Sequence, residues 1–190
     1  MLQLLLTYYE RHLPHWQPEG AALVLTWRLH GSLSKAVKVT VETSKQQSMG
    51  TTFAAMDREL DKADSGPRWL LDRRVAQCVV DALQYGERQL RLYRSRAWVL
   101  MVNHVHILIY PQARLSRITK AVMNFSARQA NAILGRTGQP FWQDESYDHW
   151  VRSPEELEKI VRYIEKNPVA AGLVDRVEDW RWSSAFRISE

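Results

Sequence analysis

Two histidines separated by one residue interrupt an otherwise apolar segment of the chain. Residues 101–109 read MVNHVHILI, with His104 and His106 on either side of Val105. The apolar and β-branched neighbours favour a buried strand. On a strand, residues i and i+2 point to the same face and lie roughly 6–7 Å apart. Two imidazoles in this arrangement can bind one metal ion, and a buried strand has little packing reason to carry them.

Length and composition predict a single domain over residues 1–190. Hydrophobic residues make up 45% of the 190 positions, which is enough for a full core. The one cysteine, Cys78, cannot form an internal disulfide, and this favours a reducing compartment. No apolar run approaches the roughly 20 residues that span a bilayer. The start of the chain lacks the basic region of a signal peptide. We therefore predict a cytoplasmic protein with no membrane partner.

The hydrophobic pattern alternates between strand and helix periods. It predicts strands over residues 21–29, 90–100, 104–110 and 149–152, and helices over 72–85, 115–134 and 154–167. This order indicates an α+β, ferredoxin-like (RRM-like) antiparallel sheet with helices on one face, followed by a C-terminal helix. Residues 1–20 are expected to form a helical or irregular lead-in. The polar stretch 34–67 is expected to be an insertion or linker with a short helix around 53–62.

Positive charge is concentrated in the middle of the chain. The net charge is +5, yet residues 88–143 contain no Asp or Glu, so the remainder is net acidic. On the predicted helix 115–134 and its start, Arg114, Arg117, Lys120 and Arg128 share one side. Such segregation suits a partner rich in phosphate. A solvated basic face is the simpler alternative, but the histidine pair lies inside the same segment and favours a functional surface.

The last predicted helix carries a second pair of polar side chains. Tyr163 and Asn167 are four residues apart and therefore lie one turn apart on one side of the helix. Together they present a hydroxyl nucleophile and an amide oxygen at the edge of the apolar stripe. Taken alone, a tyrosine at this position is more often part of the rim of a core. An Asn before Pro at a helix end is more often a capping device.

The ordered set of motifs resembles the REP-associated tyrosine transposases, which are single-tyrosine members of the HUH nuclease superfamily. The resemblance spans nearly the whole chain and depends on the order of the motifs. They are PHWQPEG at 14–20, TWRLHGS at 26–32, NHVH at 103–106, FWQ at 141–143, YIEKNPVAAGLV at 163–174 and DWRWSS at 179–184. Relatives often have Pro at the position of Val102, a difference that affects a turn and no ligand.

The resemblance implies a site and a chemistry. His104 and His106 match the metal-binding histidines, Tyr163 matches the nucleophile on a C-terminal catalytic helix, and Asn167 matches the third metal ligand. The implied reaction is metal-dependent nicking and strand transfer through a covalent 5′-phosphotyrosine. The implied cofactor is Mg²⁺ or Mn²⁺, and imidazole ligands favour Mn²⁺. Neutral histidines are needed to bind the metal, so cleavage is expected to fail at acid pH.

The implied partner is single-stranded or hairpin DNA, bound by a protein that is a monomer or a homodimer. The predicted phosphate contacts are Arg91, Arg94, Arg96, Arg114, Arg117, Lys120 and Arg128. Trp142, with Tyr147 and Trp150, is predicted to stack on unpaired bases, although each of these aromatic residues is as often core or rim. The hairpin recognised and the purpose of residues 34–67 stay open.

Two other functions fit parts of the pattern. The chain could be a hairpin-binding protein that holds DNA or RNA without cutting it, although a protein free of catalytic demand has no reason to keep the full set of motif residues. It could also be a small metallohydrolase in which His149 joins the histidine pair. A site that activates water does not need Tyr163, so this alternative explains fewer of the residues.

Overall fold

The structure is a computed structural model that describes residues 7–10, 14–17, 20–33, 57, 59–61, 66–144 and 146–187. Its centre is a four-stranded antiparallel sheet in the order β4-β5-β3-β6. The strands are β3 (Leu23–Arg28), β4 (Tyr93–Leu100), β5 (His104–Pro111) and β6 (Tyr147–Trp150). The helices are α3 (Arg73–Arg88), α4 (Leu115–Ile133) and α5 (Pro154–Ala170), with short 3-10 turns η2 (Trp69–Leu71) and η3 (Val177–Asp179). The predicted ferredoxin-like order is confirmed.

The first described segment differs from the expected lead-in. Strands β1 (Thr7–Glu10) and β2 (Pro14–Gln17) pair antiparallel, with Thr7 opposite Gln17 and Glu10 opposite Pro14. The prediction of a helical or irregular start was wrong for these residues. Threonine and aromatic residues in this segment favour extended backbone.

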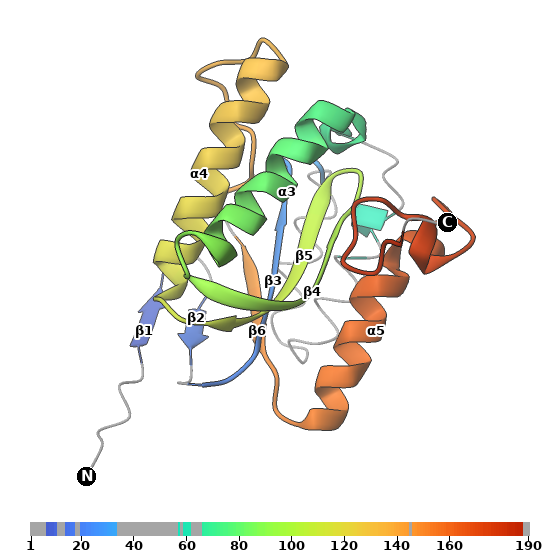
Figure 1. The fold of residues 1–190 in the computed structure, drawn as a ribbon. Helices are drawn as coiled ribbons and strands as arrows, with labels where there is room; N and C mark the ends of the chain where they lie inside the picture. Colours follow the sequence, from blue (N-terminus) through green and yellow to red (C-terminus); the bar gives the residue numbers. More distant parts are fainter. Residues whose placement is uncertain are drawn as a thin grey trace.

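The two faces of the sheet are covered by different helices. Alternate residues of β3 and β5, such as Leu25 and Ile107, join one apolar cluster with α3 and α4. The intervening residues, such as Val24 and Leu108, join a second cluster with Val161 of α5. Figure 1 shows α3 and α4 running side by side, with α5 standing apart from them. The alternation of strand side chains therefore assigns each residue to one of two layers.

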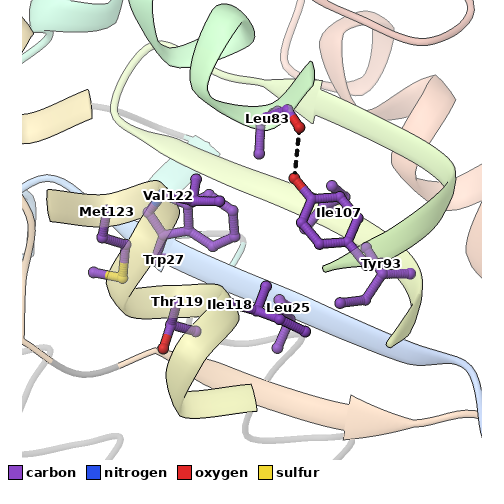
Figure 2. Close-up of a pocket in the computed structure, with 10 residues that line it drawn as sticks. Leu25, Trp27, Leu83, Tyr93, Ile107, Ile118, Thr119, Val122 and Met123 are labelled. Atoms are coloured by element: carbon purple, nitrogen blue, oxygen red, sulfur yellow. Dashed lines mark hydrogen bonds between the residues drawn. The ribbon is translucent and has the colours of Figure 1, made fainter. Parts of the chain in front are cut away.

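The packing of α3 against the sheet explains one difference from the sequence analysis. Asp72 caps α3, since its side chain accepts a hydrogen bond from the backbone of Arg74. The helix was predicted to end at residue 85, but α3 continues to Arg88, and Gly86 is buried inside it. A Cβ atom there would lie 3.1 Å from the Tyr93 hydroxyl, a tight contact that requires Tyr93 to shift by a few tenths of an ångström. This hydroxyl donates to the carbonyl of Leu83 at 2.8 Å (Figure 2). The absence of a side chain at Gly86 therefore allows α3 and Tyr93 to pack closely, and the helix does not end there.

Helix α5 begins where the sequence predicts and ends later. Ser153 caps it by accepting from the backbone of Glu156, and Pro154 takes the first position. Pro168 was expected to end the helix, but the helix continues to Ala170. The fixed backbone angle of proline fits a helix, and a proline so near the end removes one hydrogen bond without breaking the turn. Asn167 is consequently held within helical backbone.

A segment after α5 runs beside β4, which forms one border of the sheet. The backbone of Leu100 donates to the carbonyl of Trp182 at 2.8 Å, and Ser184 donates to the carbonyl of Trp98 at 2.9 Å. The indole of Trp180 adds a hydrogen bond to the carbonyl of Leu100 at 2.8 Å. Among the described residues, no helix has the length and apolar character needed to cross a membrane.

Candidate metal centre and tyrosine site

Both histidines of the apolar segment are fully buried on the α5 face of the sheet. His104 lies opposite Arg28 and His106 lies opposite Thr26 on the neighbouring strand β3. Their ring centroids are 4.7 Å apart. The residues between and after them, Val105 and Ile107, belong to the apolar cluster on the other face. Burial of Val105 and Ile107 in the apolar core therefore fixes the direction in which the two imidazoles point.

Each imidazole has a hydrogen-bond partner at its Nδ1 atom. Nδ1 of His104 donates to the amide oxygen of Asn103 at 2.7 Å, which leaves Nε2 as the atom with a free electron pair. Nδ1 of His106 lies 2.7 Å from the hydroxyl of Thr26. Such partners fix the tautomer and the orientation of a metal-binding histidine. Asn103 also donates to the carbonyl of Leu60 at 3.0 Å and so connects β5 to the segment around that residue.

A carboxylate from that segment completes the cluster. Residues 57 and 59–61 are helical, within the range where a short helix was expected. Oδ1 of Asp57 lies 3.0 Å from Nε2 of His106 and 3.6 Å from Nε2 of His104. Oδ1 of Asp61 lies 3.6 Å from Nε2 of His104. The remainder of the predicted insertion, residues 34–56, 58 and 62–65, falls outside the described residues.

The sequence analysis did not identify Asp57 or Asp61. The signal available was weak: two aspartates four residues apart, near Leu60, inside a stretch without clear apolar periodicity. Such spacing places two side chains on one side of a helix. Nothing in the local pattern shows that this helix packs against β5, because that contact is made by residues far apart in the sequence.

Burial and neighbouring charge change the acid–base behaviour of this cluster. Burial lowers the pKa of His104 to about 3, so the imidazole is neutral near pH 7 and suited to bind a metal ion. Burial, together with the charge of Asp57, raises the pKa of Asp61 to about 7. Burial alone would raise the pKa of Asp57, but the adjacent imidazoles outweigh it and hold that pKa below its ordinary value.

Helix α5 brings Tyr163 and Asn167 to the same place. The ring of Tyr163 lies 6.1 Å from that of His106, and its side chain is 42% exposed. Asn167 is buried at the side of Asp57, where its amide helps to lower the pKa of the carboxyl group. The structure therefore places the two histidines, the tyrosine and the asparagine of the sequence motifs around one point.

The donor set fits a divalent cation. Asp57, His104 and His106 each offer one ligand atom, and these atoms lie within 4.8 Å of one another. Both carboxylate oxygens of Asp57, Nε2 of His104 and Oδ1 of Asn167 are buried without a hydrogen-bond partner. Buried polar atoms are normally paired, so converging unpaired oxygen and nitrogen atoms indicate a ligand. Imidazole and carboxylate groups are the usual ligands of divalent transition metals.

The predicted cationic residues are divided between the two sides of the sheet, and Arg94 and Arg96 contact residues of the α5 side, where the histidines lie. Arg91, Arg94, Arg96, Arg114, Arg117, Lys120 and Arg128 are all exposed. Those of α4 lie on the layer opposite to the histidines. Arg117 and Lys120 line a groove of about 890 Å³ between α4 and residues 138–144 and 146. Arg94 lies over the ring of Tyr110, and Arg96 approaches Glu158 at 3.7 Å.

Trp142 lines this groove, but its ring is too deeply buried to stack on bases. Only 6% of its surface is exposed, its ring packs edge-on against Trp27, and its indole donates to the hydroxyl of Ser126 at 3.0 Å. Its assignment as a DNA contact is therefore corrected: it belongs to the core beneath α4. His149, proposed in one alternative as a further metal ligand, instead lies 2.9 Å from Glu156.

Comparison with solved structures supports the same architecture. A REP-associated tyrosine transposase, solved with a REP hairpin bound, matches 94% of this chain and 82% of its own length, with a TM-score of 0.53 and 19% sequence identity. The fold is that of a REP-associated tyrosine transposase. The resemblance predicted from the motifs is thus confirmed at the level of the fold. The protein combines this transposase-like fold with a buried His–His–Asp group able to hold a metal ion.

A second solved structure is more distant. A Deinococcus radiodurans R1 protein assigned as a transposase matches 77% of this chain and 89% of its own length, with a TM-score of 0.44 and 18% identity. The fold comparison with REP-associated tyrosine transposases therefore rests on the first structure. No family model matches the sequence, and no curated protein matches it.

Proposed function

We propose that the protein cuts and rejoins single-stranded or hairpin DNA through a covalent bond between Tyr163 and a 5′ phosphate. The observation that carries this proposal is the position of Tyr163. Its ring borders His106, and its side chain is partly open to solvent, so it stands between the buried metal ligands and an approaching substrate. A nucleophile beside a metal-ligand cluster is the arrangement that phosphoryl transfer requires.

The proposed metal ligands are Asp57, His104 and His106, with Oδ1 of Asn167 as a further donor. A bound Mg²⁺ or Mn²⁺ ion would polarise a phosphodiester oxygen and neutralise charge that develops there. Asn103 and Thr26 hold the two imidazoles so that both Nε2 atoms face the same point. The cluster is buried, and the surrounding low dielectric strengthens its electrostatic effect on the phosphate.

In the proposed cleavage step, the nucleophile is the phenol oxygen of Tyr163. The Tyr163 oxygen loses its proton to solvent, attacks phosphorus in line and forms the new O–P bond. The bond from phosphorus to the 3′ oxygen breaks, and this oxygen takes a proton from water to give a free 3′ hydroxyl. The 5′ phosphate stays on Tyr163, so the bond energy is conserved. Reversal of these steps by another 3′ hydroxyl rejoins the strand.

Recognition of the DNA is proposed to use the layer opposite to the site. The groove between α4 and residues 138–144 and 146 carries Arg117 and Lys120, which suit phosphate contacts. Ser146 of this groove directly precedes β6, the border strand next to β3 in the sheet. A strand held in the groove would therefore pass around β6 to reach Tyr163. The solved transposase with its REP hairpin supports a hairpin as the substrate class.

The test uses the purified full chain, Mn²⁺ and hairpin oligonucleotides carrying a label at the 3′ end. The wild-type protein should form a labelled adduct that survives a denaturing gel. Tyr163→Phe should reduce adduct formation by at least about 10³-fold while leaving gel-shift binding near normal, because the nucleophile alone is lost. Tyr85→Phe, at an exposed tyrosine of α3, is the matched control and should behave like wild type.

Other results of this experiment would support one of the two alternative functions. Binding without any adduct in the wild type would instead support the hairpin-binding protein that does not cut. Cleavage by Tyr163→Phe at the wild-type rate would show that water is the nucleophile and that the site acts as a metallohydrolase. Loss of cleavage in His104→Ala together with retained DNA binding is expected under the proposal.

A further inference from the structure

Two carboxylates approach the histidine pair, and only one of them belongs to the cluster described above. Asp61 follows Asp57 by four residues, so both side chains lie on one side of the same helical turn. Oδ1 of Asp61 is buried without a hydrogen-bond partner, 3.6 Å from Nε2 of His104. A second carboxylate directed at a buried, unpaired imidazole nitrogen is not explained by a site with a single acidic ligand.

The charges around the two carboxylates are unbalanced. Among the described residues, no Lys or Arg pairs with Asp57 or Asp61; their close partners are the two imidazoles. Burying an ionised carboxylate without a compensating charge is costly, and burying two side by side is more so. A single divalent cation between them would balance both charges. The same cation that would balance the charge of Asp57 would therefore also balance the charge of Asp61.

Three contacts around the two imidazoles have lengths near those expected between atoms that bind one ion. Two atoms bound to one metal at about 2.0–2.2 Å lie roughly 3.0–3.5 Å apart. The contacts of 3.0 Å from Asp57 to His106, 3.6 Å from Asp57 to His104 and 3.6 Å from Asp61 to His104 are close to this range. The ligand atoms of Asp57, His104 and His106 lie within 4.8 Å of one another, and Asp61 joins this group through its contact with His104.

We infer that Asp61 is a direct metal ligand, and that the helical turn carrying Asp57 and Asp61 holds the ion with His104 and His106 before DNA arrives. This inference rests on the proposed metal-dependent function and names the ligands of that same site. Two carboxylates and two neutral imidazoles make a site whose net charge is zero once the divalent ion is bound. Such a site needs no substrate phosphate to retain its metal, so the DNA-free protein should bind it.

Asn103 strengthens this arrangement. Its side chain joins Nδ1 of His104 to the carbonyl of Leu60, the residue immediately before Asp61. The imidazole and the carboxylate that approach the same point are therefore held in register by one amide group. A change in the position of the helical turn would move both the carboxylate and the orientation of His104.

The test measures Mn²⁺ binding to the full chain without DNA by isothermal titration calorimetry. Asp61→Asn keeps the size of the side chain and removes its charge, and it should weaken Mn²⁺ affinity by about 10–100-fold. Asp57→Asn should weaken it at least as much. Asp81→Asn is the matched control, since Asp81 is an exposed aspartate of α3 held by Gln77. It should bind Mn²⁺ like the wild type.

Visible absorption of the Co²⁺-loaded protein provides a readout of ligation itself. Loss of a direct ligand should change the band positions and intensities in Asp61→Asn, whereas a residue with only a packing role should leave the spectrum unchanged. Wild-type affinity and an unchanged spectrum in Asp61→Asn would overturn the inference. A wild type that binds no Mn²⁺ would instead contradict the metal site of the proposed function, so the two failures are distinguishable.

Discussion

The two faces of the central sheet are built from the same strands and bury different chemistry. Toward α3 and α4 the strands present Leu25, Trp27 and Ile107, which pack in a dry apolar core. Toward α5 the alternate positions present Thr26, His104 and His106. A slip of one residue in the register would exchange the two sets. The apolar face therefore does more than stabilise the fold, because its demand for burial fixes where the histidines point.

The largest effect is expected on the apolar face. Trp142→Ala removes a buried ring and its hydrogen bond to Ser126, and should lower the free energy of unfolding by about 3–5 kcal/mol. Urea denaturation monitored by circular dichroism measures this. Leu71→Ala, at a side chain that is 52% exposed, is the control and should change stability by less than about 0.5 kcal/mol. If the Trp142→Ala protein were as stable as the wild type but bound DNA more weakly, the result would support the original assignment of Trp142 as a DNA contact.

The polar face should show the opposite pattern, with metal affinity lost and the fold kept. Thr26→Val removes the hydroxyl that orients His106 and should weaken Mn²⁺ binding by about 10–100-fold. Calorimetric titration of the DNA-free protein measures the change. Thr119→Val on α4, whose hydroxyl donates to the carbonyls of Leu115 and Ser116 in its own helix, should leave the affinity unaltered. Equal affinity in both variants would mean that His106 needs no such support.

The acidic pair should make the metal-free protein sensitive to pH. The pKa of Asp61 is raised from 3.8 to about 7, so the folded protein holds a proton that the unfolded chain has released over this range. The stability from this group is thus present at low pH and is lost as the pH rises through about 7. Asp61→Asn lacks this loss and should gain on the order of 1–2 kcal/mol at pH 8 in EDTA.

His104 acts in the opposite direction. Its pKa is lowered from 6.5 to about 3, so the unfolded chain binds a proton that the folded protein excludes, and stability falls as the pH drops below about 6.5. Thermal unfolding of the wild type and Asp61→Asn from pH 4 to 8 separates the two effects. The variant should lose stability more steeply on acidification. Parallel curves would show that Asp61 is already ionised in the folded protein.

The smallest effect is expected at the exposed cations. Arg117→Ala should weaken hairpin binding only several-fold and reduce the slope of log affinity against log salt by about 1, since one phosphate contact is lost. Fluorescence anisotropy at several salt concentrations measures both quantities. Arg73→Ala, at an exposed arginine outside the groove, is the control. If both variants had the same slope of log affinity against log salt, Arg117 would not be a phosphate contact.

The sequence predicted the elements that have a regular pattern. Apolar alternation placed His104 and His106 on one strand, and helical spacing placed Tyr163 and Asn167 on one turn, which is why both pairs could be recognised. Their meeting across α5 and β5 is a tertiary contact that only the motif order indicated. Asp57 and Asp61 escaped because residues 34–67 lack a periodic apolar pattern, so no local signal revealed the contact with β5.

Other differences arise from packing. Trp142 was assigned to the surface because an aromatic run in sequence looks the same whether it lines a groove or fills a core. Gly86 suggested the end of a helix, yet it provides the room that Tyr93 needs. In each case the residue type was compatible with two roles, and the decision depended on neighbours contributed by other elements.

The hydrogen bonds between residues 98–100 and 182–184 have a consequence for self-association. Unpaired peptide groups at the rim of a sheet attract strands from other molecules and promote aggregation. Here the chain supplies its own partner along that stretch, so a second molecule cannot extend the sheet there. Removing the residues from 180 onward would bare these groups and leave the protein prone to precipitate, even with every catalytic side chain in place.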